Sequence, residues 1–216
     1  MTPPAAIDDP LSRIEHTVLG PETTPADVRR TLDEAREFGL RACVPPNYVG
    51  LATEYAPGVP LTTVVSFPHG TAATGTKVHE AERAFEDGAD ELDVVPHVGR
   101  LKAGDDDVVA RDIEAVVEAT PLPTKVIVET PLLSEAETHR VGRIAADAGA
   151  DYLKTATGFS GGGATVADVK CLAEYAPVKA SGGIGSWREA RTMFEAGAAR
   201  IGASSGATIA REYREE

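Results

Sequence analysis

The feature that most constrains the fold is a regular alternation, from Ile14 onward, of short runs rich in strand-forming residues with stretches of helical periodicity. Eight strand-like runs occur, at Ile14–Thr17, Arg41–Val44, Leu61–Phe67, Glu91–Val95, Thr124–Glu129, Tyr152–Thr155, Val178–Ser181 and Arg200–Gly202. Helical stretches follow them, at Pro25–Phe38, Asn47–Glu54, Thr76–Glu86, Asp106–Ala119, Glu135–Ala148, Val166–Tyr175, Trp187–Glu195 and from about Ser205. This order is typical of βα units that form a parallel sheet.

The number of these units indicates the architecture. Eight βα units without a linker or an internal repeat favour a closed barrel over an open doubly wound sheet, which usually has fewer strands. A length of 216 residues suits one such domain. We therefore predict an α/β protein with a single (β/α)8 TIM barrel over residues 1–216, including a short N-terminal extension, residues 1–12. Met1–Pro10 has no basic residue and no apolar run, so we expect neither a secretion signal nor a transit peptide.

The chain is strongly acidic, with a formal net charge of −13 at pH 7. Nucleic-acid binding requires clustered Lys and Arg, so this charge argues against a nucleic-acid partner. The acidic residues gather in runs such as 80–86, 105–107 and 211–216, which we interpret as solvated helix faces. Such a surface suits a protein kept soluble in concentrated salt, where repulsion between carboxylates is screened.

Membrane and metal partners are not expected either. No window approaches the roughly 18 apolar residues that a membrane helix needs. Cys43 and Cys171 are too few for a disulfide framework and lack the spacing of metal ligands. The histidines at positions 69, 79, 97 and 139 show no ligand spacing. We therefore predict a cytoplasmic protein without a metal site.

Three ionisable residues interrupt otherwise apolar strands: Asp93, Lys154 and Lys179. Burying a charge is costly unless it is paired, so these residues, on the fourth, sixth and seventh strands, are expected to be there for one another. The chain has only six lysines against fifteen arginines, which makes two lysines inside strands unusual. A structural ion-pair network, or lysines turned toward the helix layer, is the alternative interpretation.

Such a trio can support covalent chemistry. An uncharged lysine amine attacks a carbonyl carbon, whereas an ammonium group does not. A second ammonium and a pocket of low dielectric both disfavour the charged form, so we predict that Lys179 lowers the pKa of Lys154 from about 10.4 toward neutrality. Asp93 would then transfer protons while an imine forms and breaks. Barrel enzymes place such chemistry at the carboxyl-terminal ends of their strands.

Glycine-rich segments follow the sixth, seventh and eighth strands, at 157–163, 181–185 and 202–206. Glycine lets backbone N–H groups approach an anion closely, and the helix that follows adds the positive end of its dipole. Each cluster by itself is also compatible with a tight turn. Three adjacent clusters predict a site for a phosphoryl group, in keeping with the usual place of phosphate in barrels.

These residues carry a resemblance to a known family, the deoxyribose-phosphate aldolases, from about Ile14 to Gly206. The matching segments are Glu15–Leu19, Cys43–Val49, Ser66–Gly70, Gly88–Val95, Lys125–Thr130, Asp151–Phe159, Val178–Ile184 and Arg200–Gly206. By this resemblance Lys154 is the Schiff-base lysine, Lys179 the lysine that tunes it, and Asp93 the carboxylate for proton transfer. The phosphate-binding residues implied are Gly158, Gly182, Gly183, Gly202, Ser204 and Ser205.

The resemblance also implies a reaction and an assembly. The reaction is the reversible cleavage of 2-deoxy-D-ribose 5-phosphate to acetaldehyde and D-glyceraldehyde 3-phosphate, without a metal or an organic cofactor. Its partners are therefore a small phosphorylated sugar and aldehydes. We also expect a homo-oligomer, either a dimer or a tetramer.

Several positions need separate interpretation. Glu15 stands where the family usually has Asp, and Pro45 stands where Asn is frequent; both could alter contacts to a substrate hydroxyl. Some members use a tyrosine near the C-terminus, but we interpret Tyr213 as a helix residue. His16 either lines the pocket or is structural, and Cys43 is expected to be packed in its strand rather than nucleophilic.

Two other functions are compatible with the sequence. A lysine-dependent barrel aldolase with a ketone donor, such as dihydroxyacetone phosphate, would use the same Schiff-base chemistry. A sugar-phosphate isomerase without a covalent step would use Asp93 as its base, and a binding barrel would use no base at all.

Overall fold

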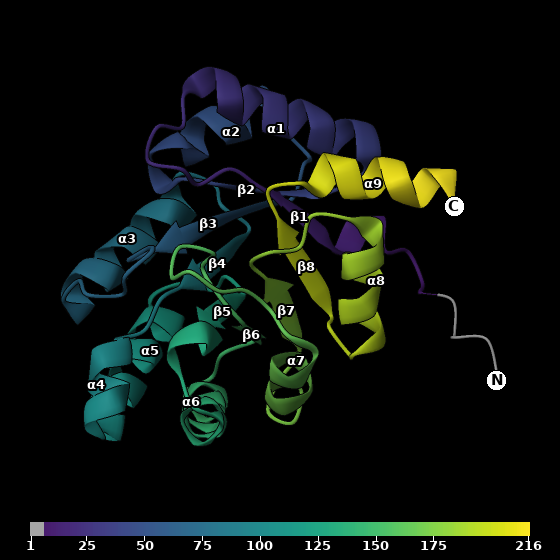
Figure 1. Cartoon of the computed structure of the whole chain (residues 1–216). Coiled ribbons are helices and arrows are strands. Elements are labelled where there is room, and N and C mark those ends of the chain that lie inside the picture. Colours follow the sequence, from purple (N-terminus) through teal and green to yellow (C-terminus); the bar gives the residue numbers. More distant parts are fainter. Residues whose placement is uncertain (1–6) are drawn as a thin grey trace, which may run out of the picture.

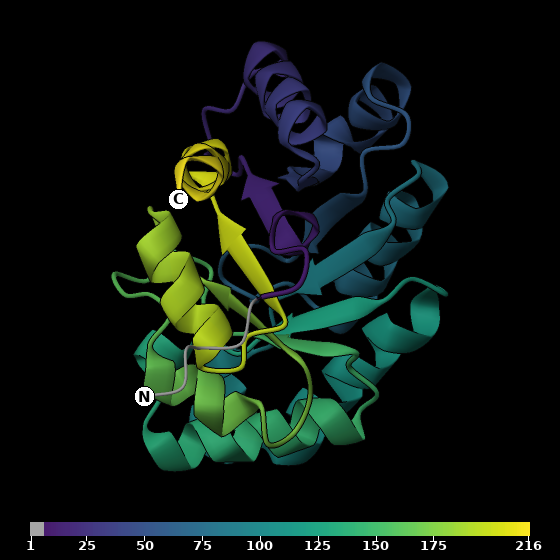
Figure 2. The same ribbon diagram turned by 90° about the vertical axis from the view of Figure 1, so that its right-hand side faces the viewer.

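The computed structural model describes residues 7–216, whose eight strands form a closed, all-parallel barrel in the order β1 to β8 (Figure 1). The strands are β1 (Ile14–Thr17), β2 (Arg41–Val44), β3 (Leu61–Val65), β4 (Glu91–Val94), β5 (Thr124–Ile127), β6 (Tyr152–Lys154), β7 (Val178–Ser181) and β8 (Arg200–Ala203). The last strand pairs with the first, so β8 and β1 lie side by side (Figure 2). The predicted (β/α)8 barrel is confirmed.

Helices follow the strands and form a ring outside them. They are α1 (Pro25–Phe38), α2 (Val49–Tyr55), α3 (Thr74–Glu86), α4 (Val98–Ala103), α5 (Asp106–Ala119), α6 (Glu135–Asp147), α7 (Val166–Leu172), α8 (Trp187–Glu195) and α9 (Gly206–Glu215). Short 3-10 turns occur at η1 (Leu11–Arg13), η2 (Pro46–Tyr48) and η3 (Thr130–Leu132). The ring closes where α9 packs beside α1 (Figure 1). No helix within residues 7–216 has the length and apolar character needed to cross a membrane.

Several predicted boundaries were wrong for identifiable reasons. The strand predicted to reach Phe67 ends at Val65, and the one predicted to reach Glu129 ends at Ile127. Ser66 and Glu129 adopt φ values of 54° and 58°, a left-handed conformation that cannot continue a strand. The helix predicted from Asn47 is divided into η2 and α2, and α4 was not predicted.

The N-terminal extension is described only in part, because residues 1–6 lie outside the described residues. Its end, η1, leads directly into β1. The Arg13 guanidinium donates hydrogen bonds to the carbonyls of Ala198 and Ala199, at 2.9 and 2.8 Å.

The strand register arranges the barrel interior in layers of side chains from alternate strands, as in other barrels of this type. The lowest layer contains the first residues of the even-numbered strands: Arg41, Glu91, Tyr152 and Arg200. The next layer contains Glu15, Thr62, Lys125 and Lys179 from the odd-numbered strands, and the third contains Cys43, Asp93, Lys154 and Gly202. The interior is therefore ionic.

The apolar core lies instead between the strands and the helices. Side chains that alternate with the ionic ones, such as Leu92, Val94, Val126 and Leu153, are buried there against the helix ring. A continuous apolar layer around the barrel supplies the hydrophobic stabilisation of the fold. The interior is thus free to hold charged groups.

Candidate active site

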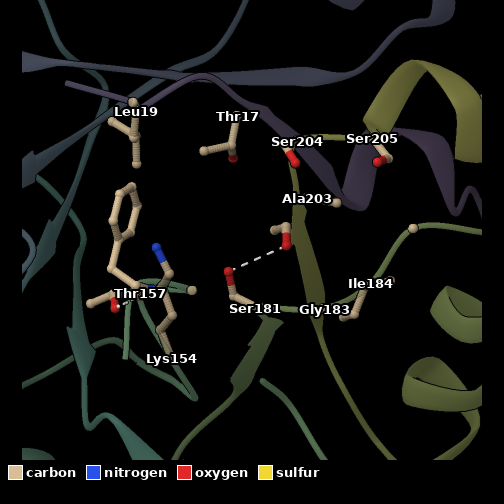
Figure 3. A pocket seen from close by; sticks show the side chains of 16 residues that line it. Thr17, Leu19, Lys154, Thr157, Ser181, Gly183, Ile184, Ala203, Ser204 and Ser205 are labelled. Carbon is tan, nitrogen blue, oxygen red and sulfur yellow. Dashed lines mark hydrogen bonds between the residues drawn. The ribbon is translucent and has the colours of Figure 1, made fainter. Parts of the chain in front are cut away.

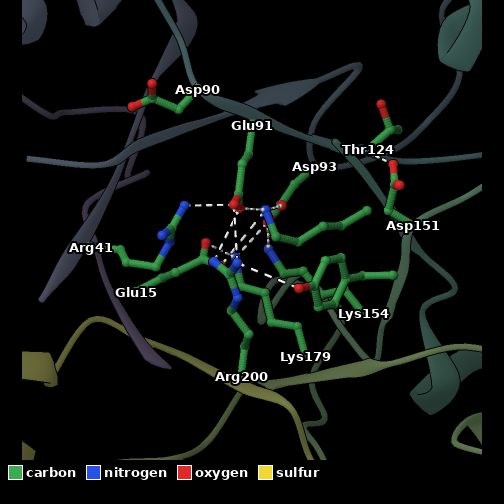
Figure 4. A network of polar contacts seen from close by, with 12 residues as sticks. Glu15, Arg41, Asp90, Glu91, Asp93, Thr124, Asp151, Lys154, Lys179 and Arg200 are labelled. Atoms are coloured by element: carbon green, nitrogen blue, oxygen red, sulfur yellow. Dashed lines mark hydrogen bonds and ion pairs between the residues drawn. The ribbon is translucent and has the colours of Figure 1, made fainter. Parts of the chain in front are cut away.

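The three ionisable strand residues meet inside the barrel, near its carboxyl-terminal opening (Figure 4). The Nζ of Lys154 lies 2.8 Å from Oδ2 of Asp93, and the Nζ of Lys179 lies 2.7 Å from the same oxygen. Asp93 and Lys179 are fully buried, whereas Lys154 keeps 2% of its surface exposed. The structure brings the predicted trio together, and neither lysine turns toward the helix layer.

Two further buried residues, Glu15 and Lys125, extend this cluster. Lys179 also donates a hydrogen bond to Glu15. The Nζ of Lys125 lies 3.2 Å from Oδ1 of Asp93 and 3.7 Å from Oε1 of Glu15. The sequence interpretation did not assign them to the site, although each is a charged residue inside a predicted strand, the same signal that identified the trio.

Three residues of the lowest layer join the same network. Glu91 lies 2.5 Å from Lys125, 2.5 Å from Arg41 and 3.0 Å from Arg200. We call the whole set the interior ion network: Glu15, Arg41, Glu91, Asp93, Lys125, Lys154, Lys179 and Arg200. It contains five cationic side chains and three carboxylates. The positive charges of the network therefore outnumber its carboxylates.

The carboxylates of the network are ionised. Burial acts to raise the pKa of Asp93, but the ammonium groups of Lys154, Lys179 and Lys125 outweigh it and hold the pKa well below its ordinary value. Burial likewise acts to raise the pKa of Glu15, and Lys125 and Lys179 lower it below its usual value. In the free protein Asp93 is therefore an anion.

The two lysines one layer below Asp93 and Lys154, Lys125 and Lys179, are firmly protonated. Burial acts to lower the pKa of Lys179, but Asp93 and Glu15 outweigh it and raise the pKa. The pKa of Lys125 is also raised, because Glu15 and Asp93 outweigh the effect of burial. Lys179 is thus a fixed cation that shares one carboxylate oxygen with Lys154.

A pocket of about 470 Å³ opens above Lys154 (Figure 3). The loops after β1, β6, β7 and β8 line it, and Lys154 is the one cationic side chain among the described residues of its wall. Lys154 enters from one side, and Ser204 and Ser205 lie across the pocket from it (Figure 3). Every residue predicted to bind phosphate is on this wall: Gly158, Gly182, Gly183, Gly202, Ser204 and Ser205.

The available backbone donors lie at the start of α9 rather than α8. At α8, the amides of Gly185 and Ser186 donate to Glu189 and the amide of Trp187 donates to Glu212. The predicted dipole contribution of the helix after β7 is therefore offset by carboxylates. In the part of the chain that the structure describes, α9 has no side-chain cap at Ser205. Its first N–H groups remain suitable for an anion.

The loops after β6 and β7 are held in direct contact by glycine. A Cβ on Gly163 would collide with the carbonyl group of Gly182. The same carbonyl accepts a hydrogen bond of 3.0 Å from the amide of Ala164. Gly182 and Gly183 have φ values of 95° and 74°, in the left-handed region that favours glycine. These loops form one continuous wall.

An aromatic pair that was not predicted lies beside the amine of Lys154. The rings of Phe67 and Phe159 meet edge to face, with centroids 5.3 Å apart. The Nζ of Lys154 lies 5.9 Å from the centroid of Phe67. Phe159 is 49% exposed although it lines the pocket. An exposed aromatic side chain at a concave wall is typical of a ligand-binding surface.

Comparison with known proteins assigns the family. The model of the family described as DeoC/LacD family aldolase matches residues 16–213. The chain belongs to the DeoC/LacD family of aldolases.

Individual DeoC/LacD relatives match almost the whole chain. A deoxyribose-phosphate aldolase of Haloarcula marismortui is 63% identical over 210 residues, which covers 97% of this chain and 90% of that protein. The solved structure of the aldolase QR15 has a TM-score of 0.94 at 38% identity and covers 97% of both chains. A deoxyribose phosphate aldolase from Aeropyrum pernix, described as a unique tetrameric structure, has a TM-score of 0.86 at 35% identity, with 94% and 90% coverage. The family resemblance is confirmed.

The two departures from the family pattern lie in different places in this DeoC/LacD barrel. Glu15 is fully buried against Lys125 and Lys179, and it does not line the pocket above Lys154. Pro45 lines a neighbouring hollow of about 370 Å³ on the side of β2 and β3. It does not line the pocket above Lys154.

Three further residues lie outside the pocket wall of this DeoC/LacD barrel. His16 is buried and its Nε2 lies 2.7 Å from Glu34, which indicates a structural role. Tyr213 lies in α9, where its ring packs on Trp187 with centroids 4.7 Å apart. Cys43 is fully buried, and burial raises the pKa of its thiol to about 11. A thiol of this kind is a poor nucleophile.

One group of residues has the spacing of metal ligands. Ligand atoms of Glu15, Cys43 and Asp93 all lie within 4.8 Å of one another. Both carboxylates are already bound to lysine ammonium groups, and the thiol remains protonated at neutral pH. Metal ligands must be deprotonated and free to coordinate, so this group does not suit a metal ion.

Proposed function

We propose that this chain is a class I aldolase that reversibly cleaves 2-deoxy-D-ribose 5-phosphate to acetaldehyde and D-glyceraldehyde 3-phosphate through a Schiff base on Lys154. The observation that carries the proposal is the position of Lys154. It belongs to an interior ion network with excess positive charge, and it is also the one network residue on the pocket wall among the described residues. The relative from Haloarcula marismortui bears the name of this activity.

The covalent cycle begins with the uncharged amine of Lys154. Its Nζ attacks the aldehyde carbon of the open-chain sugar phosphate, and the resulting carbinolamine loses water to give a protonated imine. The imine accepts the electron pair released when the bond between C2 and C3 breaks, and the proton of the C3 hydroxyl is taken up by a base. Glyceraldehyde 3-phosphate leaves, and an enamine of acetaldehyde remains on Lys154.

The second half restores the enzyme. The enamine carbon takes a proton, and water adds to the imine to release acetaldehyde and the free amine. Asp93, ionised and 2.8 Å from Lys154, is placed to accept and return protons at the nitrogen. Lys179 supplies the fixed positive charge that disfavours a second ammonium beside it.

The phosphate is held across the pocket from Lys154. Gly158, Gly182 and Gly183 allow backbone approach, and Ser204 and Ser205 stand beside the uncapped start of α9. Backbone dipoles suffice for an anion in such a cradle, despite the acidic net charge of the protein. Binding the phosphate remote from the reacting carbons aligns them with the amine.

We further propose that the protein acts in the cytoplasm as a homo-oligomer, a dimer or a tetramer. The tetramer described for the relative from Aeropyrum pernix supports assembly. Light scattering across a salt series would test assembly.

The test is adduct mapping. The protein is incubated with acetaldehyde, reduced with borohydride, and its intact mass and peptides are measured. We expect a reduced two-carbon adduct on Lys154 and none in Lys154→Arg, because arginine forms no imine. Lys154→Arg should also lose turnover by several orders of magnitude while keeping the wild-type circular dichroism spectrum. A ketone adduct without an acetaldehyde adduct would show that the donor is a ketone and not acetaldehyde. Turnover that survives in Lys154→Arg would exclude the covalent mechanism.

A further inference from the structure

The interior ion network continues from the pocket to the opposite end of the barrel. Starting at the pocket, Lys154 contacts Asp93 at 2.8 Å, and Asp93 contacts Lys125 at 3.2 Å. Lys125 then contacts Glu91 at 2.5 Å. Glu91 is the first residue of β4, two residues before Asp93, and the strand register places it in the lowest layer of the interior. Figure 4 shows its contacts with the rest of the network. An unbroken chain of ion pairs therefore joins the amino-terminal end of the barrel to the amine.

We infer that Glu91 is a positioning residue that sets the pH at which Lys154 becomes reactive, acting through Lys125 and Asp93. The inference rests on the proposed function, because it concerns the lysine that forms the imine. Glu91 touches neither the pocket wall nor Lys154 among the contacts of the described residues. The influence of Glu91 on Lys154 is electrostatic. It depends on which carboxylate forms the strongest ion pair with the Lys125 ammonium.

The competition for Lys125 is the physical basis. Lys125 is fully buried, so its charge must be balanced by carboxylates within the barrel. Glu91, at 2.5 Å, is its nearest anion, ahead of Asp93 at 3.2 Å and Glu15 at 3.7 Å. While Glu91 balances the charge of Lys125, the carboxylate of Asp93 remains available to the ammonium groups of Lys154 and Lys179. Without the charge of Glu91, the Lys125 ammonium would pair more strongly with Asp93. The negative charge of Asp93 would then stabilise the ammonium form of Lys154 less.

Glu91 is in turn held from below by two arginines. Arg41 lies 2.5 Å away and Arg200 lies 3.0 Å away, and both keep about one-sixth of their side-chain surface exposed. A neutralising change at Arg41 should therefore act in the opposite sense to one at Glu91. Among the described residues Glu91 is the one acidic partner of Arg41, so Arg41 can affect the amine only through Glu91 or over a longer distance.

Charged and titratable side chains face this interior from seven of the eight strands. Strand by strand, they are Glu15 on β1, Arg41 and Cys43 on β2, Glu91 and Asp93 on β4, Lys125 on β5, Tyr152 and Lys154 on β6, Lys179 on β7 and Arg200 on β8. Beyond the end of β5, Glu129 accepts the amide of Thr157. Strand β3, Leu61–Val65, contains no charged residue.

The experiment compares the acidic limb of the pH dependence of kcat/KM in three variants. Glu91→Gln removes a negative charge, so the limb should move to lower pH by on the order of one unit. Arg41→Met removes a positive charge, so the limb should move to higher pH by a smaller amount. Asp112→Asn is the matched control, because Asp112 forms a buried ion pair with Lys77 at 2.5 Å outside the barrel interior. It should lower stability without moving the limb.

The outcomes separate the possibilities. A constant loss of folded enzyme lowers kcat/KM at every pH and does not move the limb, so the test remains valid if part of the Glu91→Gln protein fails to fold. Arg41→Met tests the same inference independently. A purely structural Glu91 would give lower stability with an unmoved limb, and shifts of the same sign in both variants would also overturn the inference. Absence of a Lys154 adduct in the wild-type protein would instead overturn the proposed function.

Discussion

Gly202 leaves the space through which the side chain of Lys179 crosses the barrel, because a Cβ at position 202 would lie 2.7 Å from Cε of Lys179. The same Cβ would lie 2.8 Å from Oγ of Ser181. The glycines of the pocket wall therefore have more than one function in this protein. Gly182 and Gly183 shape the loop after β7, and Gly202, within β8, also makes room for a buried cation.

Gly202→Ala should lower kcat by roughly 10- to 100-fold, because a displaced Lys179 no longer fits its place between Asp93 and Glu15 and small displacements in a site are costly. Steady-state kinetics would measure the loss. The matched control is Gly75→Ala in α3, where a Cβ would meet no atom within 4 Å. It should keep full activity and stabilise the helix by about 0.5–1 kcal/mol. Wild-type kcat in Gly202→Ala would contradict the role of the glycine.

Gly163→Ala should weaken the binding of phosphorylated substrate. The added Cβ forces the loop after β6 away from the Gly182 carbonyl and so spreads the cradle. Loss of one hydrogen bond to an anionic group costs about 1.5–3 kcal/mol, which corresponds to a rise in KM of roughly 10- to 100-fold. The KM for unphosphorylated 2-deoxy-D-ribose should change little. Equal changes for both sugars would show that the loop contact does not serve the phosphate.

Acid should destabilise the protein in a defined pH window. Glu15 and Asp93 have lowered pKa values in the folded state, so their contribution is fully present above their ordinary values of about 4.3 and 3.9. It is lost as the pH falls through the lower folded-state values. The midpoint of urea unfolding should therefore fall steeply below about pH 5.

Glu15→Gln should be less stable at neutral pH and show a shallower fall in acid, since one of the two titrating groups is gone. Glu86→Gln is the control, because the Glu86 side chain is 62% exposed on α3. Its acid dependence should match that of the wild-type protein. Parallel curves for Glu15→Gln and wild type would argue against this source of acid sensitivity.

Salt should stabilise the fold. The formal charge of −13 implies net repulsion at the surface, which added ions screen. Thermal unfolding followed by circular dichroism should give a Tm that rises from low to molar KCl. Sucrose is the control, because it favours the compact state without screening charge. A Tm that is constant in KCl would refute the interpretation of the acidic surface.

The sequence by itself determined the barrel and most of its elements. Hydrophobic periodicity and the glycine and proline boundaries are local signals, and the helices Pro25–Phe38, Asp106–Ala119 and Trp187–Glu195 have the predicted bounds. The occurrence of charged residues in apolar strands likewise singled out Asp93, Lys154 and Lys179. Burying a charged side chain costs free energy wherever it occurs, so a charged residue within an apolar strand by itself indicates a buried partner or a functional site.

Only the tertiary structure decided how these charges share their partners. That Lys154 and Lys179 meet at one oxygen of Asp93, and that Lys125 links Asp93 to Glu91, follows from the register and the closure of the barrel. The strand ends at Ser66 and Glu129 were also decided there, because left-handed backbone at a residue other than glycine has no reliable local signal. Electrostatic coupling depends on distance in space, and distance across a closed sheet is not written in the order of the residues.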